Sequence, residues 1–89
     1  MMYPFMQLED NTEIVHSELL ENEKVKVYVE KPVEGGFQSA ICWLPGYDWQ
    51  EIEGFGKNDI EKFQEILEST AHLIIQFAKD GGFDNASNF

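Results

Sequence analysis

Few residues of this chain have side chains suited to chemistry, and their spacing does not form a recognisable site. The only histidines are His16 and His72, and the only cysteine is Cys42. A zinc site takes three or four Cys, His or carboxylate ligands, and a reactive thiol needs surroundings that lower its pKa. Cys42 instead lies in an apolar run, which predicts a buried and unreactive thiol. His72 has Glu68 four residues before it, which places it on a polar helix face.

The sequence also lacks the loop motifs of common catalytic and ligand-binding sites. No serine lies in a nucleophile-elbow motif, and neither Gly-Gly pair has the lysine and helix start of a phosphate-binding loop. Residues 80–85 carry oxygen-bearing side chains, but they lack the spacing and the closing glutamate of a calcium loop. We therefore predict a protein that is not an enzyme and has no catalytic residue, metal site or cofactor.

Acidic side chains are the dominant polar feature of the sequence. The chain has 17 acidic residues, 6 lysines and no arginine, which gives a formal net charge of −11. The whole excess comes from residues 9–23, with −6, and residues 48–68, with −5. This charge argues against direct binding to nucleic-acid phosphates or to anionic membrane surfaces. Two interpretations stay open: a solvated surface that confers solubility, or an acidic surface that docks on a basic protein, for example a nucleic-acid-binding protein.

Five residues are candidates for partner binding. Glu61, Glu65 and Glu68 have the i, i+4, i+7 spacing that lines one face of a helix and would attract a basic partner from a distance. Tyr47 and Trp49 follow a Pro-Gly turn and are of the aromatic types that dominate interface hot spots. The alternative for these aromatic residues is a lid over the core with their polar atoms in water.

The elements that must position these residues are short strands followed by one long helix. The clearest strand alternates valines at residues 25, 27 and 29 with polar residues, and the most apolar one shows hydrophobic residues on both faces. Expected strands lie at residues 3–8, 12–20, 24–30 and 37–44. Residues 47–55 fit either a further strand or an irregular segment.

The helix is predicted over residues 59–80, with Asn58 as its N-cap and Glu61 at the third helical position. Gly81 and Gly82 supply its end, and Ile75 is expected on its polar face. We predict an α+β fold with an antiparallel sheet of four or five strands and this helix packed on one face. Residues 1–82 form a single domain, and residues 83–89 form a flexible C-terminal tail.

The middle of the chain resembles the HicB-like antitoxin domain. The resemblance covers residues 24–78 and is carried by the Gly35-Gly36-Phe37 turn, the strand after it and Leu44-Pro45-Gly46 at its end. It implies a three-stranded sheet with a helix and the neutralisation of a small basic ribonuclease toxin. The chain departs from the family pattern at Trp43, where an acidic residue is usual, and at Tyr47. About three extra residues precede the helix, and the family's DNA-binding appendage is missing.

Location and function follow as expectations from these observations. No apolar run approaches the ~20 residues of a membrane span, and the first eight residues lack the features of a signal peptide. A single cysteine fits a reducing compartment, so we expect a cytoplasmic protein without membrane contact. We predict a non-catalytic acidic module that masks a basic surface of a protein partner, as an antitoxin or anti-defence inhibitor does. The alternative is a small structural protein that forms a homodimer through its aromatic cluster.

Overall fold

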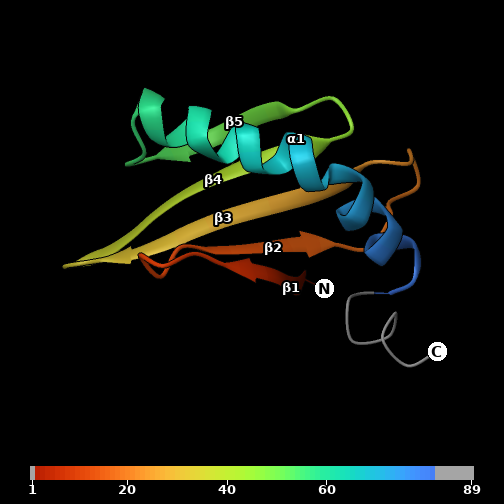
Figure 1. Ribbon diagram of the computed structural model, residues 1–89, viewed down its shortest axis with the longest axis horizontal. Helices are drawn as coiled ribbons and strands as arrows, with labels where there is room; N and C mark the ends of the chain where they lie inside the picture. Colours follow the sequence, from red (N-terminus) through yellow and green to blue (C-terminus); the bar gives the residue numbers. More distant parts are fainter. Residues whose placement is uncertain (1, 82–89) are drawn as a thin grey trace.

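The computed structural model describes residues 2–81 and has five strands followed by one helix (Figure 1). The elements are β1 (Met2–Gln7), β2 (Glu13–Ser17), β3 (Val25–Val33), β4 (Gly36–Leu44), β5 (Asp48–Glu53) and α1 (Lys57–Lys79). The predicted α+β fold is therefore confirmed. The tail expected at residues 83–89 lies outside the described residues.

The strands form one antiparallel sheet in the order β1-β2-β3-β4-β5, so each strand pairs with its neighbours in the sequence. Helix α1 crosses one face of this sheet (Figure 1). The segment that periodicity left undecided, residues 47–55, contains β5, which pairs with β4 at the sheet edge. Residue Glu51 of β5 has a φ of 50°, and the register shifts beside it. Such a bulge interrupts an edge strand and limits its pairing with other chains.

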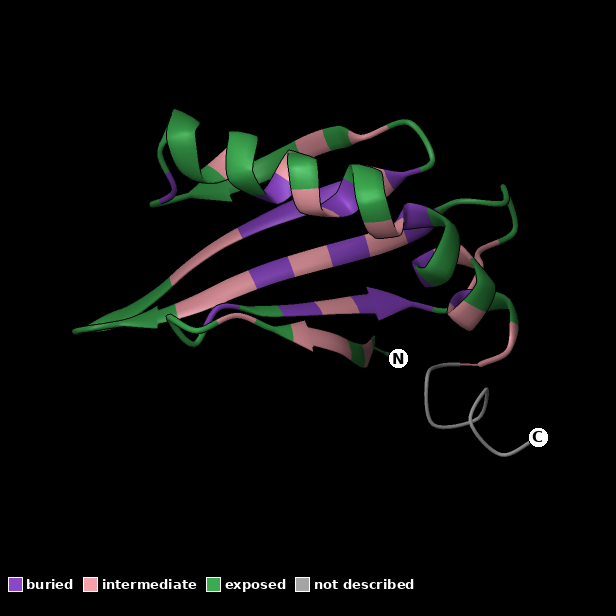
Figure 2. Ribbon diagram, in the orientation of Figure 1, coloured by how far each residue is buried: buried purple, intermediate pink, exposed green. Residues whose placement is uncertain are grey.

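The core lies between the sheet and α1. Its strand residues alternate with exposed or half-buried ones, as the valines of β3 show most clearly (Figure 2). The fully enclosed members from the sheet are Ile14, Val25, Val27, Val29, Ala40, Cys42 and Leu44. The helix contributes Phe63, Leu67, Ala71, Ile74 and Ala78. The spacing of these helix residues is the apolar stripe that the sequence predicts.

The start of α1 differs from the prediction. The N-cap is Gly56 and not Asn58, and the helix begins at Lys57. Asp59 is the third helical residue, and its Oδ2 accepts a hydrogen bond from the Gly56 N–H at 3.0 Å. The prediction failed because Gly56 has no side chain by which a cap can be recognised, whereas Asn58 is a residue type that caps often use.

A second difference concerns the polar face of α1. Ile75, predicted to be exposed there, is half-buried and packs against the core. Leu73 is instead the exposed apolar residue of the helix, with 42% of its surface accessible. The side of α1 that packs on the sheet therefore also includes Ile75.

Candidate functional site

Trp49 joins the edge strand β5 to the helix. It lies opposite Cys42 in the sheet and therefore points to the α1 side, where its ring lies 6.5 Å from that of Phe63. Its indole N–H donates a hydrogen bond to Oε1 of Gln64 at 2.8 Å. Trp49 thus covers the edge of the core and also forms one wall of a surface groove, described next.

The groove runs between β5 and the first half of α1 and has a volume of about 360 Å³. Its lining consists of Trp49, Ile60, Glu61, Gln64 and Glu65. Trp49 and Ile60 are half-buried and give it an apolar wall, whereas both glutamates are exposed at its rim. An apolar wall with two carboxylates suits an arginine or lysine side chain, because the aliphatic stem packs while the charged head meets the acids.

Glu68 extends the site by one helical turn. Its Oε2 accepts a hydrogen bond from Nε2 of Gln64 at 3.2 Å, and Oε1 of Gln64 accepts from Trp49. The amide orientation of Gln64 is therefore fixed at both ends. Glu68 acts on the groove by holding Gln64 in place, while Glu61 and Glu65 face incoming groups directly.

Tyr47 is separate from this groove. It has a φ of 55° in the turn before β5, is half-buried and packs against the core. The aromatic segment is divided further by the sheet, because Trp43 lies on the face opposite to that of Trp49. The indole N–H of Trp43 donates to Oε1 of Gln50 at 3.3 Å on that other face. The aromatic residues around the turn therefore do not form one continuous surface.

Sequence reasoning missed two residues of the groove, Gln64 and Ile60. The helical spacing of Ile60 with Phe63 and Leu67 predicts a core residue and gives no sign of a groove. Gln64 lies four residues after Ile60 and four before Glu68, so its place on the face of the glutamates was visible. Its contact with Trp49, fifteen residues earlier in the chain, had no sequence signal.

The groups considered for catalysis are distributed over the molecule. Cys42 is buried. Burial, the larger cause, and the negative charge of Asp48, the smaller one, raise the pKa of its thiol to about 12. His16 is fully enclosed, its ring lies 5.7 Å from that of Tyr3 and 6.4 Å from that of Phe5, and its Nδ1 is 2.8 Å from the carbonyl oxygen of Ser17. Within residues 2–81, no three His, Cys, Asp or Glu side chains are grouped so that they could hold a metal ion.

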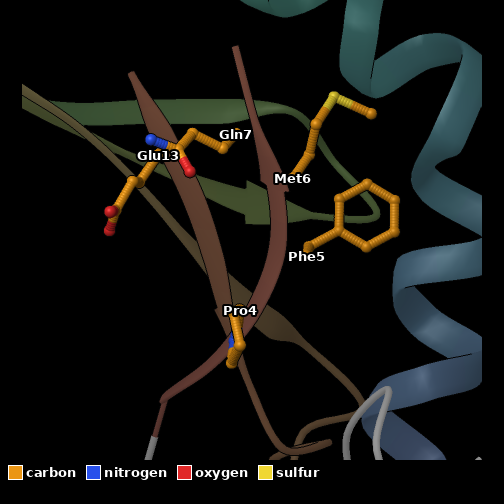
Figure 3. A pocket seen from close by; sticks show the side chains of 5 residues that line it. All are labelled: Pro4, Phe5, Met6, Gln7 and Glu13. Carbon is orange, nitrogen blue, oxygen red and sulfur yellow. The ribbon is translucent and has the colours of Figure 1, made fainter. Parts of the chain in front are cut away.

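Another hollow, of about 310 Å³, lies at the bulge of β1 (Figure 3). Phe5 and Met6 leave the strand on the same side, toward α1, while Gln7 and Glu13 point away from it (Figure 3). This arrangement follows from the register shift between Pro4 and Met6. The hollow contains a single carboxylate, that of Glu13, and no group that would act as its catalytic partner.

Comparisons with known proteins do not assign this site. No protein-family model, curated protein or solved structure matches the chain. Among residues 2–81, α1 is the only helix, and it is not apolar enough along its length to cross a membrane. The function must therefore be inferred from the geometry and charge of the molecule itself.

Proposed function

We propose that this protein is a non-catalytic acidic binding module that docks on a basic surface of a protein partner in the cytoplasm and masks it. The groove between β5 and α1 is the observation that supports this function best. It combines the apolar wall of Trp49 with the exposed carboxylates of Glu61 and Glu65. The role is that of an antitoxin or anti-defence inhibitor, in line with the resemblance to the HicB-like antitoxin domain.

The net charge of −11 and the groove would act at different stages of binding. Acidic side chains attract a basic surface over distance, which raises the association rate and weakens as salt is added. Insertion of a basic side chain into the groove excludes water from its stem, and such contacts mainly govern dissociation. The two effects can be separated by kinetics because they respond differently to salt.

The groove is tested with an unstructured arginine-rich peptide and three forms of the protein. These are the wild type, Glu61→Gln/Glu65→Gln and, as a control of equal net charge, Glu21→Gln/Glu23→Gln, whose residues are also exposed. NMR titration should shift the indole N–H signal of Trp49. We expect the groove variant to bind about fivefold more weakly than the control, from the loss of two exposed charge contacts. Equal affinities of the two variants would mean that the glutamates at the groove are only solvated surface.

Kinetics with an identified basic partner provide the second test. Changing Glu61, Glu65 and Glu68 to lysine should slow association and reduce its dependence on salt. Trp49→Ala should leave association nearly unchanged and speed dissociation by removing the wall of the groove. An association rate at low salt that is indifferent to the charge reversal would contradict the proposed role of the acidic helix face.

A further inference from the structure

The face of the sheet opposite α1 has no cover from any element of residues 2–81. Its residues are those that alternate with the buried positions of the strands. They include an apolar row formed by Pro4, Val15, Tyr28 and Ile41, which are consecutive cross-strand neighbours. Ile41, which lies opposite Tyr28 on one side and Gln50 on the other, is only 7% exposed. We call this surface the open face.

A row of glutamates crosses the open face next to the apolar row. Glu13 on β2 lies directly opposite Glu30 on β3, Glu30 is opposite Ser39 on β4, and Ser39 is opposite Glu53 on β5. Like charges in directly opposed positions oppose strand pairing. None of the three carboxylates forms an ion pair with a lysine in the described part of the chain. Lys26 on this face lies over the Trp43 ring, two rows away, and Lys24 lines a hollow with Trp43 and Gln50 at the same end of the face.

A second apolar group lies on the other side of the glutamate row. Pro32 pairs with Phe37 where the β3–β4 hairpin projects beyond the rest of the sheet (Figure 1). Phe37 is 64% exposed, the highest value among the large hydrophobic residues described. The open face therefore presents an acidic row between two apolar groups. Exposed residues dominate the tip of the hairpin (Figure 2).

We propose that the open face is a second docking surface, which binds a basic amphipathic helix of a protein partner. Charge complementarity selects the partner, because the three glutamates have no lysine partner within residues 2–81 and the whole chain is strongly acidic. The apolar groups on both sides select an occupant that also carries apolar side chains. This inference stands independently of the groove, which lies on the α1 side of β5.

The spacing of the glutamates favours a helix that lies across the strands. Neighbouring strands are ~4.8 Å apart, so Glu30 and Glu53 lie about 5 and 14 Å from Glu13 along the row. Helix residues at i, i+3 and i+10 lie on one side at about 0, 4.5 and 15 Å. An extended strand would place its same-side residues at about 6.7 and 13 Å, which misses Glu30. The Tyr28 row and Phe37 are about 13 Å apart, close to the ~10–12 Å diameter of a helix with its side chains, so one helix can reach both apolar groups with side chains on its two flanks.

A second copy of the same chain is a poorer occupant. Two open faces brought together would oppose two rows of three glutamates, with no arginine in either chain to balance them. The repulsion between such rows is greatest where water is excluded. We therefore expect no homodimer through the open face, and sedimentation of the protein alone tests this.

The probe is a synthetic helical peptide with lysines at i, i+3 and i+10 and leucines on either side of the lysine line. A control peptide has the same composition in scrambled order. One NMR titration distinguishes the surfaces, because the indole N–H of Trp49 reports on the groove and the backbone N–H of Phe37 lies on the open face in the row next to Glu30. We expect the helical peptide to shift the Phe37 signal, to leave the Trp49 signal in place and to bind better than the scrambled peptide. Glu13→Gln/Glu30→Gln should weaken binding about fivefold, and Phe37→Ser about tenfold.

Matched variants make this result specific. Glu21→Gln/Glu23→Gln removes the same charge elsewhere, and Glu61→Gln/Glu65→Gln removes it at the groove. Both variants should therefore bind the helical peptide with nearly the affinity of the wild type. Equal weakening by all three double variants would overturn the inference, because the peptide would then respond only to net charge. If only the groove variant lost affinity for the helical peptide, the inference about the open face would be overturned, and the proposed function of the groove would stand. A homodimer in sedimentation that Phe37→Ser abolishes would assign the face to a second copy and overturn the inference as well.

Discussion

The indole N–H of Trp49 donates to Oε1 of Gln64 and so ties the edge strand β5 to the middle of α1. Gln64→Leu should lower the free energy of unfolding by about 1 kcal/mol, because the indole N–H loses its partner in a partly buried position. A double-mutant cycle with Trp49→Phe measures the coupling by chemical denaturation. A coupling close to zero would mean that the hydrogen bond is replaced by water at no cost.

The pairing of Glu13 with Glu30 should have a measurable effect on stability. Either Glu13→Gln or Glu30→Gln should raise the free energy of unfolding by about 0.2–1 kcal/mol, since each removes one of two directly opposed charges. In Glu30→Gln, the new amide oxygen would still accept the hydrogen bond that the Tyr28 hydroxyl donates to Glu30. Glu34→Gln, at the exposed hairpin turn, is the matched control and should have little effect. Destabilisation by Glu13→Gln would show that the row is not repulsive.

The observed helix start gives a paired test of the cap. Asp59→Ala should cost about 1 kcal/mol of unfolding free energy, because the Gly56 N–H loses its acceptor and the first helical turn loses a negative charge. Asn58→Ala, one residue earlier and exposed, should be nearly neutral. The reverse order of the two effects in thermal melts would restore Asn58 as the capping residue.

Asp10 should contribute to stability in a pH-dependent manner. Hydrogen bonding by Thr12, whose backbone N–H donates to Oδ1, together with Lys31 lowers the pKa of Asp10 from 3.8 to about 2. A carboxyl with a lowered folded-state pKa stabilises the fold above pH 4, and this contribution is lost as the pH falls toward 2. Because Asp10 and Lys31 are both about a third or more exposed, the effect is at most about 1 kcal/mol. The difference between wild type and Asp10→Asn in urea melts should therefore shrink from pH 5 to pH 2, and a constant difference would contradict this account.

Cys42 should be unreactive in the folded protein. Its thiol is enclosed in the core, and its raised pKa of about 12 leaves almost no thiolate at neutral pH. We expect labelling by a thiol reagent at pH 8 to be slower than in denaturant by a factor that follows the unfolding equilibrium. Labelling of the native protein at the denatured rate would show that the β4 thiol is accessible.

Much of this fold was predictable because its strongest signals are local. The valines of β3 alternate along the strand, and the apolar residues of β4 occupy both faces, as the sequence predicts. The burial of Cys42 follows from the same pattern. Strand β5 gave no such signal because Glu51 bulges out of register and most of its residues are exposed acids or amides.

The candidate site was predictable only in part. The helical spacing of Glu61, Glu65 and Glu68 places all three on the exposed side of α1, as the structure has them. The positions of the aromatic residues could not be predicted, because the backbone of the turn between Trp43 and Trp49 decides on which side of the sheet each of them lies. The hydrogen bond from Trp49 to Gln64 likewise depends on how α1 crosses the sheet, which no local pattern specifies.

The order of the sheet has a consequence for synthesis on the ribosome. Because each strand pairs with the one before it, all four ladders can form before α1 emerges. Until then, the side of the nascent sheet that holds Val27 and Leu44 has no cover. At ~5–20 residues per second, the 23 residues of α1 take roughly one to five seconds to appear. This interval is when the growing chain is most exposed to aggregation and to capture by chaperones, and the arrival of the helix ends it.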